Sequence, residues 1–462
     1  VFMISKSAIK KLAQILGEEH ILTNKDDMLP YCHDATHKEF PPEVVVFPEN
    51  ANEISKIMQL ANKEVFPVVP RGAGSGMSGG ALAVSGGLVM SMERLNRILL
   101  IDEKNLIARV EPGVITGHLQ EEVEKCGLFY PPDPASLDIS TIGGNVAECA
   151  GGPRAVKYGV TRDYVLGLKV VLPNGDILGI GVETAKGVVG YDLTRLIVGS
   201  EGTLAIITEI ILRLIPRPEK KKTMLVIFPE ILSAAQCVSN IIKEKIVPTT
   251  IEFMDSLSVQ LVREQLNLEL PKGNIALLLI ELDGDQSQIE KDSERVGAIC
   301  RDTGSLDIHI ACDDKGAENL WAARRSLSPA LLALKPHKIN QDVVVPKSRL
   351  AEFVMALSDI GQRHNLLIPS FGHAGDGNIH VNIMLNKDDK DEEKRAKIAL
   401  REVFKLVIDF RGTISGEHGI GLSKKPFIGM EIPESGLMLM RGIKKVFDPN
   451  GILNPGKIFD EI

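Results

Sequence analysis

The chain has 462 residues, a formal net charge of −8, 44% apolar residues and 25% charged residues. This length exceeds what one hydrophobic core supports, so we expect at least two domains. The acidic balance argues against a nucleic-acid-binding protein, and no stretch approaches the roughly 18–20 apolar residues of a membrane span. Six scattered cysteines without a CxxC pair argue against an iron–sulfur cluster in the chain, and they predict reduced thiols in a cytoplasmic protein.

The first half of the chain predicts a strand-rich mixture of helices and strands. We expect a helix over roughly 5–17 and another over 52–63, with Asn52 as its cap. The Asn-Gly pair within 166–178 predicts a β-hairpin. Short β-branched runs between glycines predict further strands at 43–48, 66–72, 87–92 and 106–113.

The composition changes at a Pro- and charge-rich join, and we expect a domain boundary near 217. After it, helical patterns such as 233–245 alternate with apolar runs such as 274–284. This alternation favours an antiparallel sheet covered by helices on one face. The last 40 or so residues predict a helix followed by an anchored tail. The fold class expected for the whole chain is α+β.

The segment "VVPRGAGSGMSGG" (68–80) is the first of three glycine clusters. Glycines allow backbone N–H groups to approach a phosphate closely. A dinucleotide-binding Rossmann loop requires a helix directly after the glycines, whereas strand-like residues follow here, and no GK[ST] is present. The loop therefore predicts a pyrophosphate site between strands and not a nicotinamide site. A flexible turn is the alternative.

Two further glycine clusters, at 131–159 and 188–210, follow the first in an order that is characteristic of one family. Together the three segments resemble the FAD domain of the vanillyl-alcohol-oxidase/p-cresol-methylhydroxylase flavoproteins. Within that superfamily the chain is similar to the group of the glycolate oxidase catalytic subunit, D-lactate dehydrogenase and D-2-hydroxyglutarate dehydrogenase. The resemblance extends from about residue 40 to the end.

The resemblance implies how the chain holds FAD. It assigns the pyrophosphate to "PRGAGS" (70–75), the flavin ring and ribityl chain to 138–152, and the adenine half to 201–208. No histidine lies between 38 and 117, so we expect FAD to be bound non-covalently. The implied FAD contacts are Arg71, Gly72, Gly74, Ser75, Gly76, Ser140, Gly143, Gly144, Asn145, Gly151, Gly202 and Ile207.

A cluster of histidines and a carboxylate follows in the second half. His373 and His380 flank a Gly-Asp-Gly turn, and "ISGEHGIG" (414–421) adds Glu417 and His418. Two imidazoles and one carboxylate suit a divalent ion such as Zn²⁺, Fe²⁺ or Mn²⁺. The alternative is that each histidine is an ordinary core or turn residue. The resemblance implies that His373, His380 and Glu417 bind the metal and that His418 is the base.

A carboxylate substrate also requires a cationic anchor, and a planar guanidinium suits it best. The helical segment 319–332 offers Arg324 and Arg325, and the family's Trp-x-x-Arg pattern selects Arg324. The resemblance adds Asn382 as a substrate contact and Lys338 as a weaker second anchor. The local chain length near Lys338 differs from the hydroxyglutarate enzymes, which favours a short monocarboxylate.

The resemblance implies a two-lobed FAD-binding domain of small mixed sheets with helices (1–217). It also implies a substrate-binding cap domain with the metal site, built on an antiparallel sheet covered by helices (218–420), and a C-terminal segment returning to the FAD domain (421–462). We expect FAD-dependent oxidation of a D-2-hydroxy acid, with D-lactate as the leading substrate and glycolate or D-2-hydroxyglutarate as alternatives. Hydride transfer to flavin N5 and a carbanion route both suit these residues.

Because the chain lacks haem, iron–sulfur and nicotinamide motifs, we expect the electrons to leave to O₂, a quinone or a partner. An electron-transfer flavoprotein or an iron–sulfur subunit is the partner that we favour. A metallohydrolase would leave the glycine clusters unexplained, and a non-catalytic flavin-binding scaffold would leave the histidine cluster unexplained.

Overall fold

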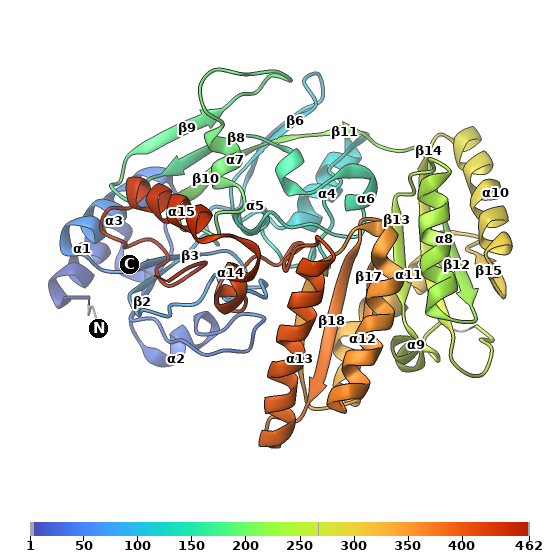
Figure 1. Ribbon diagram of the computed structural model, residues 1–462. Coiled ribbons are helices and arrows are strands. Elements are labelled where there is room, and N and C mark those ends of the chain that lie inside the picture. The colour runs from blue at the N-terminus through green and yellow to red at the C-terminus, as the bar shows by residue number, and fades with distance from the viewer. Residues whose placement is uncertain (1–3, 267, 461–462) are drawn as a thin grey trace. The chain divides into compact units, whose positions relative to one another are not determined.

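The computed structural model describes residues 4–266 and 268–460 (Figure 1). The chain divides into two compact units. The first comprises Val1–Gly151, Val160–Arg217 and Glu417–Ile462, and the second comprises Gly152–Gly159 and Pro218–Gly416. The chain therefore passes from one unit to the other more than once, and residues distant in sequence build each unit.

The N-terminal part of the first unit is a small mixed sheet packed against two helices. The sheet has the order β1 (Ile21–Leu22), β2 (Val44–Val46), β4 (Leu88–Ser91) and β3 (Val68–Arg71), with β2 and β3 both parallel to β4. Helices α1 (Lys6–Leu16) and α3 (Ala51–Glu64) contribute apolar faces to its core. Asn50 and not Asn52 caps α3, since Asn50 accepts the N–H of Glu53 and Asn52 already lies inside the helix.

A second sheet of the first unit is entirely antiparallel. Its order is β5 (Ile98–Asp102), β6 (Ile107–Val110), β10 (Ile206–Arg213), β8 (Val165–Val171) and β9 (Ile177–Gly181). The β8–β9 pair is the hairpin that the Asn-Gly turn predicts. The remaining elements of this unit are α2 (Lys25–Met28), α4 (Thr116–Lys125), β7 (Leu128–Phe129), α5 (Ile142–Glu148), α7 (Leu193–Ile197), β11 (Ile215–Pro216), α14 (Ile428–Glu431) and α15 (Glu434–Phe447).

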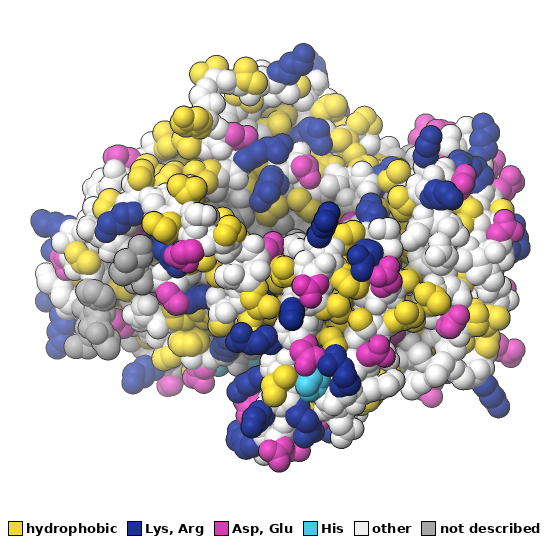
Figure 2. Space-filling model, viewed as in Figure 1, with side chains coloured by type: hydrophobic (Ala, Val, Ile, Leu, Met, Phe, Trp, Pro, Cys, Tyr) yellow, Lys and Arg dark blue, Asp and Glu magenta, His cyan; other side chains and the backbone are white. Residues whose placement is uncertain are grey.

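The predicted C-terminal helix is α15, and only Leu437 among its residues is fully buried. Met438, Leu439 and Val446 are exposed, and Figure 2 shows hydrophobic side chains at the surface over α15. The tail that follows is anchored, because the N–H of Asn454 donates to the carbonyl of Val68 in β3 (2.8 Å). This segment is therefore part of the first unit.

The second unit contains a seven-stranded antiparallel sheet. Its order is β15 (Asp307–Ile310), β12 (Lys220–Phe228), β14 (Ala276–Gly284), β13 (Thr250–Met254), β17 (Ser370–His373), β18 (Asn378–Leu385) and β16 (His337–Val344). Its helices are α6 (Ala155–Tyr158), α8 (Ile231–Lys243), α9 (Ser256–Val262), α10 (Gln286–Asp302), α11 (Asp314–Ala330), α12 (Leu350–His364) and α13 (Lys390–Asp409).

Helices cover both faces of this sheet, not one face as the sequence pattern suggested. Every residue of β18 is buried, as are the consecutive residues Met224–Phe228 of β12, so neither face is open to solvent there. Leu320, Ala323 and Leu327 of α11 pack with one set of strand residues that includes Phe371 and Met384. This face, covered by α11, also carries His373 and His380, the two histidines singled out from the sequence.

No helix in the described part of the chain has the length and apolar character needed to cross a membrane.

Candidate functional site

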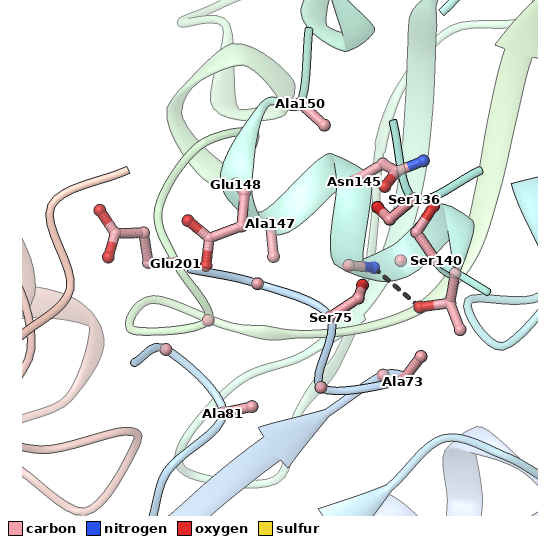
Figure 3. Close-up of a pocket in the computed structure, with 18 of the residues that line it drawn as sticks. Ala73, Ser75, Ala81, Ser136, Ser140, Asn145, Ala147, Glu148, Ala150 and Glu201 are labelled. Atoms are coloured by element: carbon pink, nitrogen blue, oxygen red, sulfur yellow. Dashed lines mark hydrogen bonds between the residues drawn. The ribbon is translucent and has the colours of Figure 1, made fainter. Parts of the chain in front are cut away.

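The first unit contains a cavity of about 250 Å³ formed by its three glycine-rich segments. All the residues predicted to contact FAD line this cavity, so the structure brings these distant segments together. Ala73, Ser75 and Ala81 lie across it from Ser140, Asn145 and Glu148 (Figure 3). The lining also includes Met77, Met92, Pro112, Ala135, Ser136, Glu148 and Glu201, which the sequence analysis did not single out.

Close packing requires glycine at two positions of the first loop, and backbone conformation also requires it at one of them. Gly74 has a φ of +69°, and a Cβ there would lie 2.2 Å from Nη2 of Arg71. A Cβ on Gly72 would lie 2.3 Å from Oγ1 of Thr141, whereas Gly76 faces open space. The loop therefore passes directly over Arg71 and Thr141, and its backbone can approach a ligand in the cavity.

Arg71 supplies a buried positive charge beneath this loop. The residue is 6% exposed, and its Nη2 donates to the carbonyl of Pro30 (3.1 Å). Among the described residues its Nη1 has no hydrogen-bond partner. A buried cation below a glycine loop favours a negatively charged group such as a pyrophosphate. The residues at this end of the cavity thus fit the phosphates of FAD.

A buried polar network fixes the opposite wall. Oγ1 of Thr116 accepts a hydrogen bond from Nδ2 of Asn145 (2.7 Å) and lies 3.0 Å from Oγ of Ser140. The N–H of Gly144 donates to Oγ1 of Thr141 (3.2 Å). Because these side chains hold one another, Ser140 and Asn145 are preorganised at the cavity wall.

Two carboxyl groups, those of Glu148 and Glu201, lie near each other at one end of the cavity (Figure 3). Burial raises the pKa of Glu201, and the N–H groups of Ile420 and Gly421, which donate to its carboxylate (2.8 and 2.6 Å), offset this rise only in part. Burial and then the Glu201 carboxylate raise the pKa of Glu148 well above its ordinary value. Glu148 also ends α5, where a negative charge is unfavourable. The pKa values of both carboxyl groups are raised, and Glu148 is the more readily protonated of the two.

Glu417 and His418 also line this cavity. Nε2 of His418 lies 3.9 Å from Oε1 of Glu417. A Cβ on Gly151 would lie 2.8 Å from Oε2 of Glu417, so the glycine at 151 makes room for that carboxylate. The predicted base and the predicted carboxylate ligand thus belong to the same cavity as the predicted FAD contacts.

The second unit brings His373 and His380 together on adjacent strands. His373 ends β17 and His380 lies in β18, and their ring centroids are 5.2 Å apart with nearly perpendicular planes. Both side chains are largely buried. Neighbouring imidazoles at this separation fit a shared divalent ion, so the residues present are compatible with a metal.

Glu252, which no sequence motif marks, lies at the centre of this group. Glu252 is fully buried in β13 and pairs in register with His373. Its Oε1 lies 2.5 Å from Nδ1 of His373, and its Oε2 lies 2.5 Å from Nη2 of Arg324. Burial alone would raise the pKa of Glu252, but the charges of His373 and Arg324 outweigh it and hold this pKa at about 2. The sequence around Glu252, residues 250–254, shows only a short run of mostly apolar and β-branched residues.

Arg324 and Arg325 differ sharply in their surroundings. Arg324 is 9% exposed, and its guanidinium stacks 4.7 Å from the ring centroid of Phe371. Arg325 points outward from α11 and forms an ion pair with Glu318. The structure therefore places Arg324 on the face that carries the histidines and Arg325 at the surface.

Asn382 and Lys338 lie on this face but are engaged by protein groups. Asn382 is fully buried, and its Oδ1 accepts from Nδ2 of Asn340 (2.7 Å) on the neighbouring strand. Nζ of Lys338 donates to the carbonyl and Oγ of Ser328 (2.6 and 2.7 Å). Burial lowers the pKa of Lys338. Asn340 was not identified from sequence, because only the strand register reveals its place beside Asn382.

The chain continues from the second unit directly to Glu417. The N–H of Gly416 donates to Oδ2 of Asp342 (2.8 Å), and Asp342 pairs in register with His380. A Cβ on Gly416 would lie 1.9 Å from Nδ2 of Asn378, so only glycine fits. The residue before Glu417 is thus fixed beside the strand that carries His380.

Comparisons with known proteins decide between the possible families. Residues 42–181 match an FAD binding domain, and residues 217–458 match the C-terminal domain of FAD linked oxidases. The chain belongs to the FAD-linked oxidase family. This membership confirms FAD as the cofactor and an oxidoreductase as the class of enzyme, and it contradicts the metallohydrolase and scaffold alternatives.

Among relatives of this FAD-linked oxidase, the glycolate oxidase subunit GlcD of Bacillus subtilis is 46% identical. The aligned region covers 99% of this chain and 97% of the relative. A D-lactate dehydrogenase of Anaerostipes hadrus is 35% identical and covers 98% of both chains. The solved structure of p-cresol methylhydroxylase superposes on this chain with a TM-score of 0.80 at 18% sequence identity. The superposition covers 98% of this chain and 96% of the p-cresol methylhydroxylase chain. The predicted two-domain fold class is thereby confirmed.

Proposed function

We propose that this oxidoreductase converts a short D-2-hydroxy monocarboxylate, with D-lactate as the leading substrate, to the 2-oxo acid. The observation that carries the proposal is the polar face under α11, where a buried arginine and His373 contact one carboxylate and His380 lies beside His373. A buried guanidinium suits a substrate carboxylate, and paired imidazoles suit a metal that binds the neighbouring hydroxyl.

In the proposed mechanism Arg324 binds and orients the substrate carboxylate. His373, His380 and Glu417 would hold a divalent ion, which when bound lowers the pKa of a hydroxyl group. His418 removes the proton from the C2 hydroxyl as general base. Bound FAD supplies the hydride acceptor, at flavin N5. The glycine loop and Arg71 hold the pyrophosphate of FAD, and the network of Thr116, Ser140 and Asn145 keeps the flavin end of the cavity fixed.

The engagement of Lys338 supports a monocarboxylate. Its amine already donates to two oxygens of Ser328, so at most one of its three N–H groups is left for a second substrate carboxylate. D-2-Hydroxyglutarate is therefore disfavoured. Glycolate is the second candidate, because the relative named as a glycolate oxidase subunit is 46% identical over nearly the whole chain.

Reduced flavin must pass its electrons on, and we propose that a partner protein accepts them. The six cysteines are scattered in sequence, and the relative from Bacillus subtilis is itself named as a subunit. The name of this relative as a subunit supports a second protein as the acceptor, and we propose that this protein is an iron–sulfur subunit or an electron-transfer flavoprotein. We also propose that FAD is non-covalent, so acid precipitation should release all the yellow chromophore as FAD.

A substrate panel tests the proposed function. The FAD-loaded protein is mixed without oxygen with D-lactate, L-lactate, glycolate or D-2-hydroxyglutarate, and flavin absorbance is followed. D-Lactate should bleach the flavin fastest, with glycolate next and L-lactate and D-2-hydroxyglutarate much slower. Faster bleaching by D-2-hydroxyglutarate would contradict the monocarboxylate assignment, and faster bleaching by L-lactate would contradict the D-configuration.

A further inference from the structure

The carboxylate of Glu252 lies in the middle strand of the seven-stranded sheet, on the face covered by α11. It is fully buried, as are all the residues of β13. Transferring a carboxylate into a protein interior is costly unless partners compensate for the lost hydration. The partners of Glu252 are His373, to which the proposed function assigns metal binding, and Arg324, to which it assigns substrate binding.

Each carboxylate oxygen of Glu252 serves one of these residues. Oε1 is 2.5 Å from Nδ1 of His373, and Oε2 is 2.5 Å from Nη2 of Arg324. A carboxylate that accepts the Nδ1–H of a histidine fixes its tautomer and ring orientation, so Nε2 becomes the nitrogen that binds a metal. The same carboxylate holds one corner of the guanidinium of Arg324.

The ring of Phe371 limits the remaining freedom of this group. Arg324 stacks on Phe371 at 4.7 Å, and Phe371 lies 5.7 Å from the ring of His380. The Nε of Arg324 is buried and lacks a hydrogen-bond partner within the described chain. Among the described residues, Glu252 is the one carboxylate that forms an ion pair with Arg324. The same carboxylate also contacts His373.

We infer that Glu252 is a positioning residue that orients His373 for the metal and Arg324 for the substrate carboxylate at the same time. This inference rests on the proposed function for the identity of both ligands. A buried ion pair that serves stability alone can be replaced without loss by apolar residues of similar volume. A positioning role instead predicts that the charge and geometry of Glu252 control two separate binding affinities.

Glu281 provides a matched control. It lies one strand away on β14, is 6% exposed, and accepts hydrogen bonds from Oγ1 of Thr223 (2.9 Å) and from Nε1 of Trp321 on α11 (3.1 Å). Glu281 is thus also a buried glutamate in contact with α11, but it is bonded to neither His373 nor Arg324. The Glu281→Gln variant therefore shows how much metal and D-lactate affinity changes when any buried glutamate on this face of the sheet is replaced.

The experiment compares Glu252→Gln, Glu252→Asp and Glu281→Gln in the FAD-loaded protein. Zn²⁺ or Mn²⁺ affinity is measured by competition with a chelator, and D-lactate affinity is measured without oxygen from the dependence of the flavin bleaching rate on D-lactate concentration. We expect Glu252→Gln to weaken metal affinity by about 10- to 100-fold, as for other partners of metal-binding histidines. D-Lactate affinity should fall by about tenfold, while Glu281→Gln changes neither.

Glu252→Asp keeps the charge but shortens the side chain, so it should lose less metal affinity than Glu252→Gln and serves as the test if Glu252→Gln does not fold. Wild-type affinities in either Glu252 variant would overturn the inference, as would equal losses in Glu281→Gln. If the wild-type protein binds no metal, the proposed metal site is wrong. The D-lactate measurement then still decides whether Glu252 positions Arg324.

Discussion

The N–H of Gly416 donates a hydrogen bond to the carboxylate of Asp342, at 2.8 Å. Asp342 pairs in register with His380 across β16 and β18, and Gly416 is followed directly by Glu417. One hydrogen bond therefore connects the strand next to a proposed metal-binding histidine with the segment that carries the proposed carboxylate ligand.

Asp342→Ala should release this segment and weaken metal binding by about 10- to 100-fold, because positioning contacts around metal ligands have effects of this size. Chelator competition on the FAD-loaded protein measures the change. Gln341→Ala is the control, since neighbouring strand residues point to opposite faces of the sheet. If the two variants bind metal equally well, Asp342 has no role in holding Glu417.

Arg324→Ala should weaken substrate affinity much more than Arg325→Ala. Loss of a charge-assisted contact costs about 1.5–3 kcal/mol, which corresponds to roughly one to two orders of magnitude in affinity. Arg325 forms only a surface ion pair with Glu318, so its removal should have little effect. The dependence of the anaerobic bleaching rate on D-lactate concentration provides both affinities. Equal affinities would show that another residue binds the carboxylate.

His418→Gln should slow flavin reduction by about 10²- to 10⁴-fold while substrate affinity stays close to that of the wild type. A positioned general base contributes a rate factor of this order, and the base is not required for binding. Rapid mixing at saturating D-lactate measures the rate of bleaching. Reduction at the wild-type rate would rule out His418 as the base.

The raised pKa of Glu148 should make stability depend on pH. Because the folded protein holds this proton more tightly than the unfolded chain, the stabilising contribution is complete below the ordinary glutamate pKa of 4.5 and is lost as the pH rises through the raised value. The slope is at most about 1.4 kcal/mol per pH unit. Glu148→Gln, which cannot ionise, should abolish this part of the dependence, whereas the exposed Glu103→Gln should retain it. Thermal unfolding across pH 5–9 tests this, and identical profiles for Glu148→Gln and wild type would contradict it.

The sequence predicted best those features that depend on local pattern. Glycines at 72 and 74 indicate a loop that a side chain would obstruct, and the order of the three glycine clusters identified the family and its FAD. The spacing of His373 and His380 around a Gly-Asp-Gly turn predicted that the two imidazoles meet, because a tight turn joins β17 to β18.

Features that depend on strand register could not be predicted. Glu252 lies more than a hundred residues before His373 in the chain, and only the pairing of β13 with β17 brings them together. The pairing of Asn340 with Asn382 is of the same kind. The raised pKa of Glu148 depends on its burial and on the neighbouring Glu201, which no local pattern reveals.

The most direct test of the central claim is rapid mixing of D-lactate with the FAD-loaded protein in the absence of oxygen, with and without prior removal of divalent ions by a chelator. We expect rapid bleaching of the metal-loaded protein with formation of one pyruvate per flavin. Metal removal should slow bleaching by at least about 10²-fold, and added metal should restore it. Bleaching at the same rate without metal, or no bleaching of the metal-loaded protein by any 2-hydroxy acid, would contradict the account.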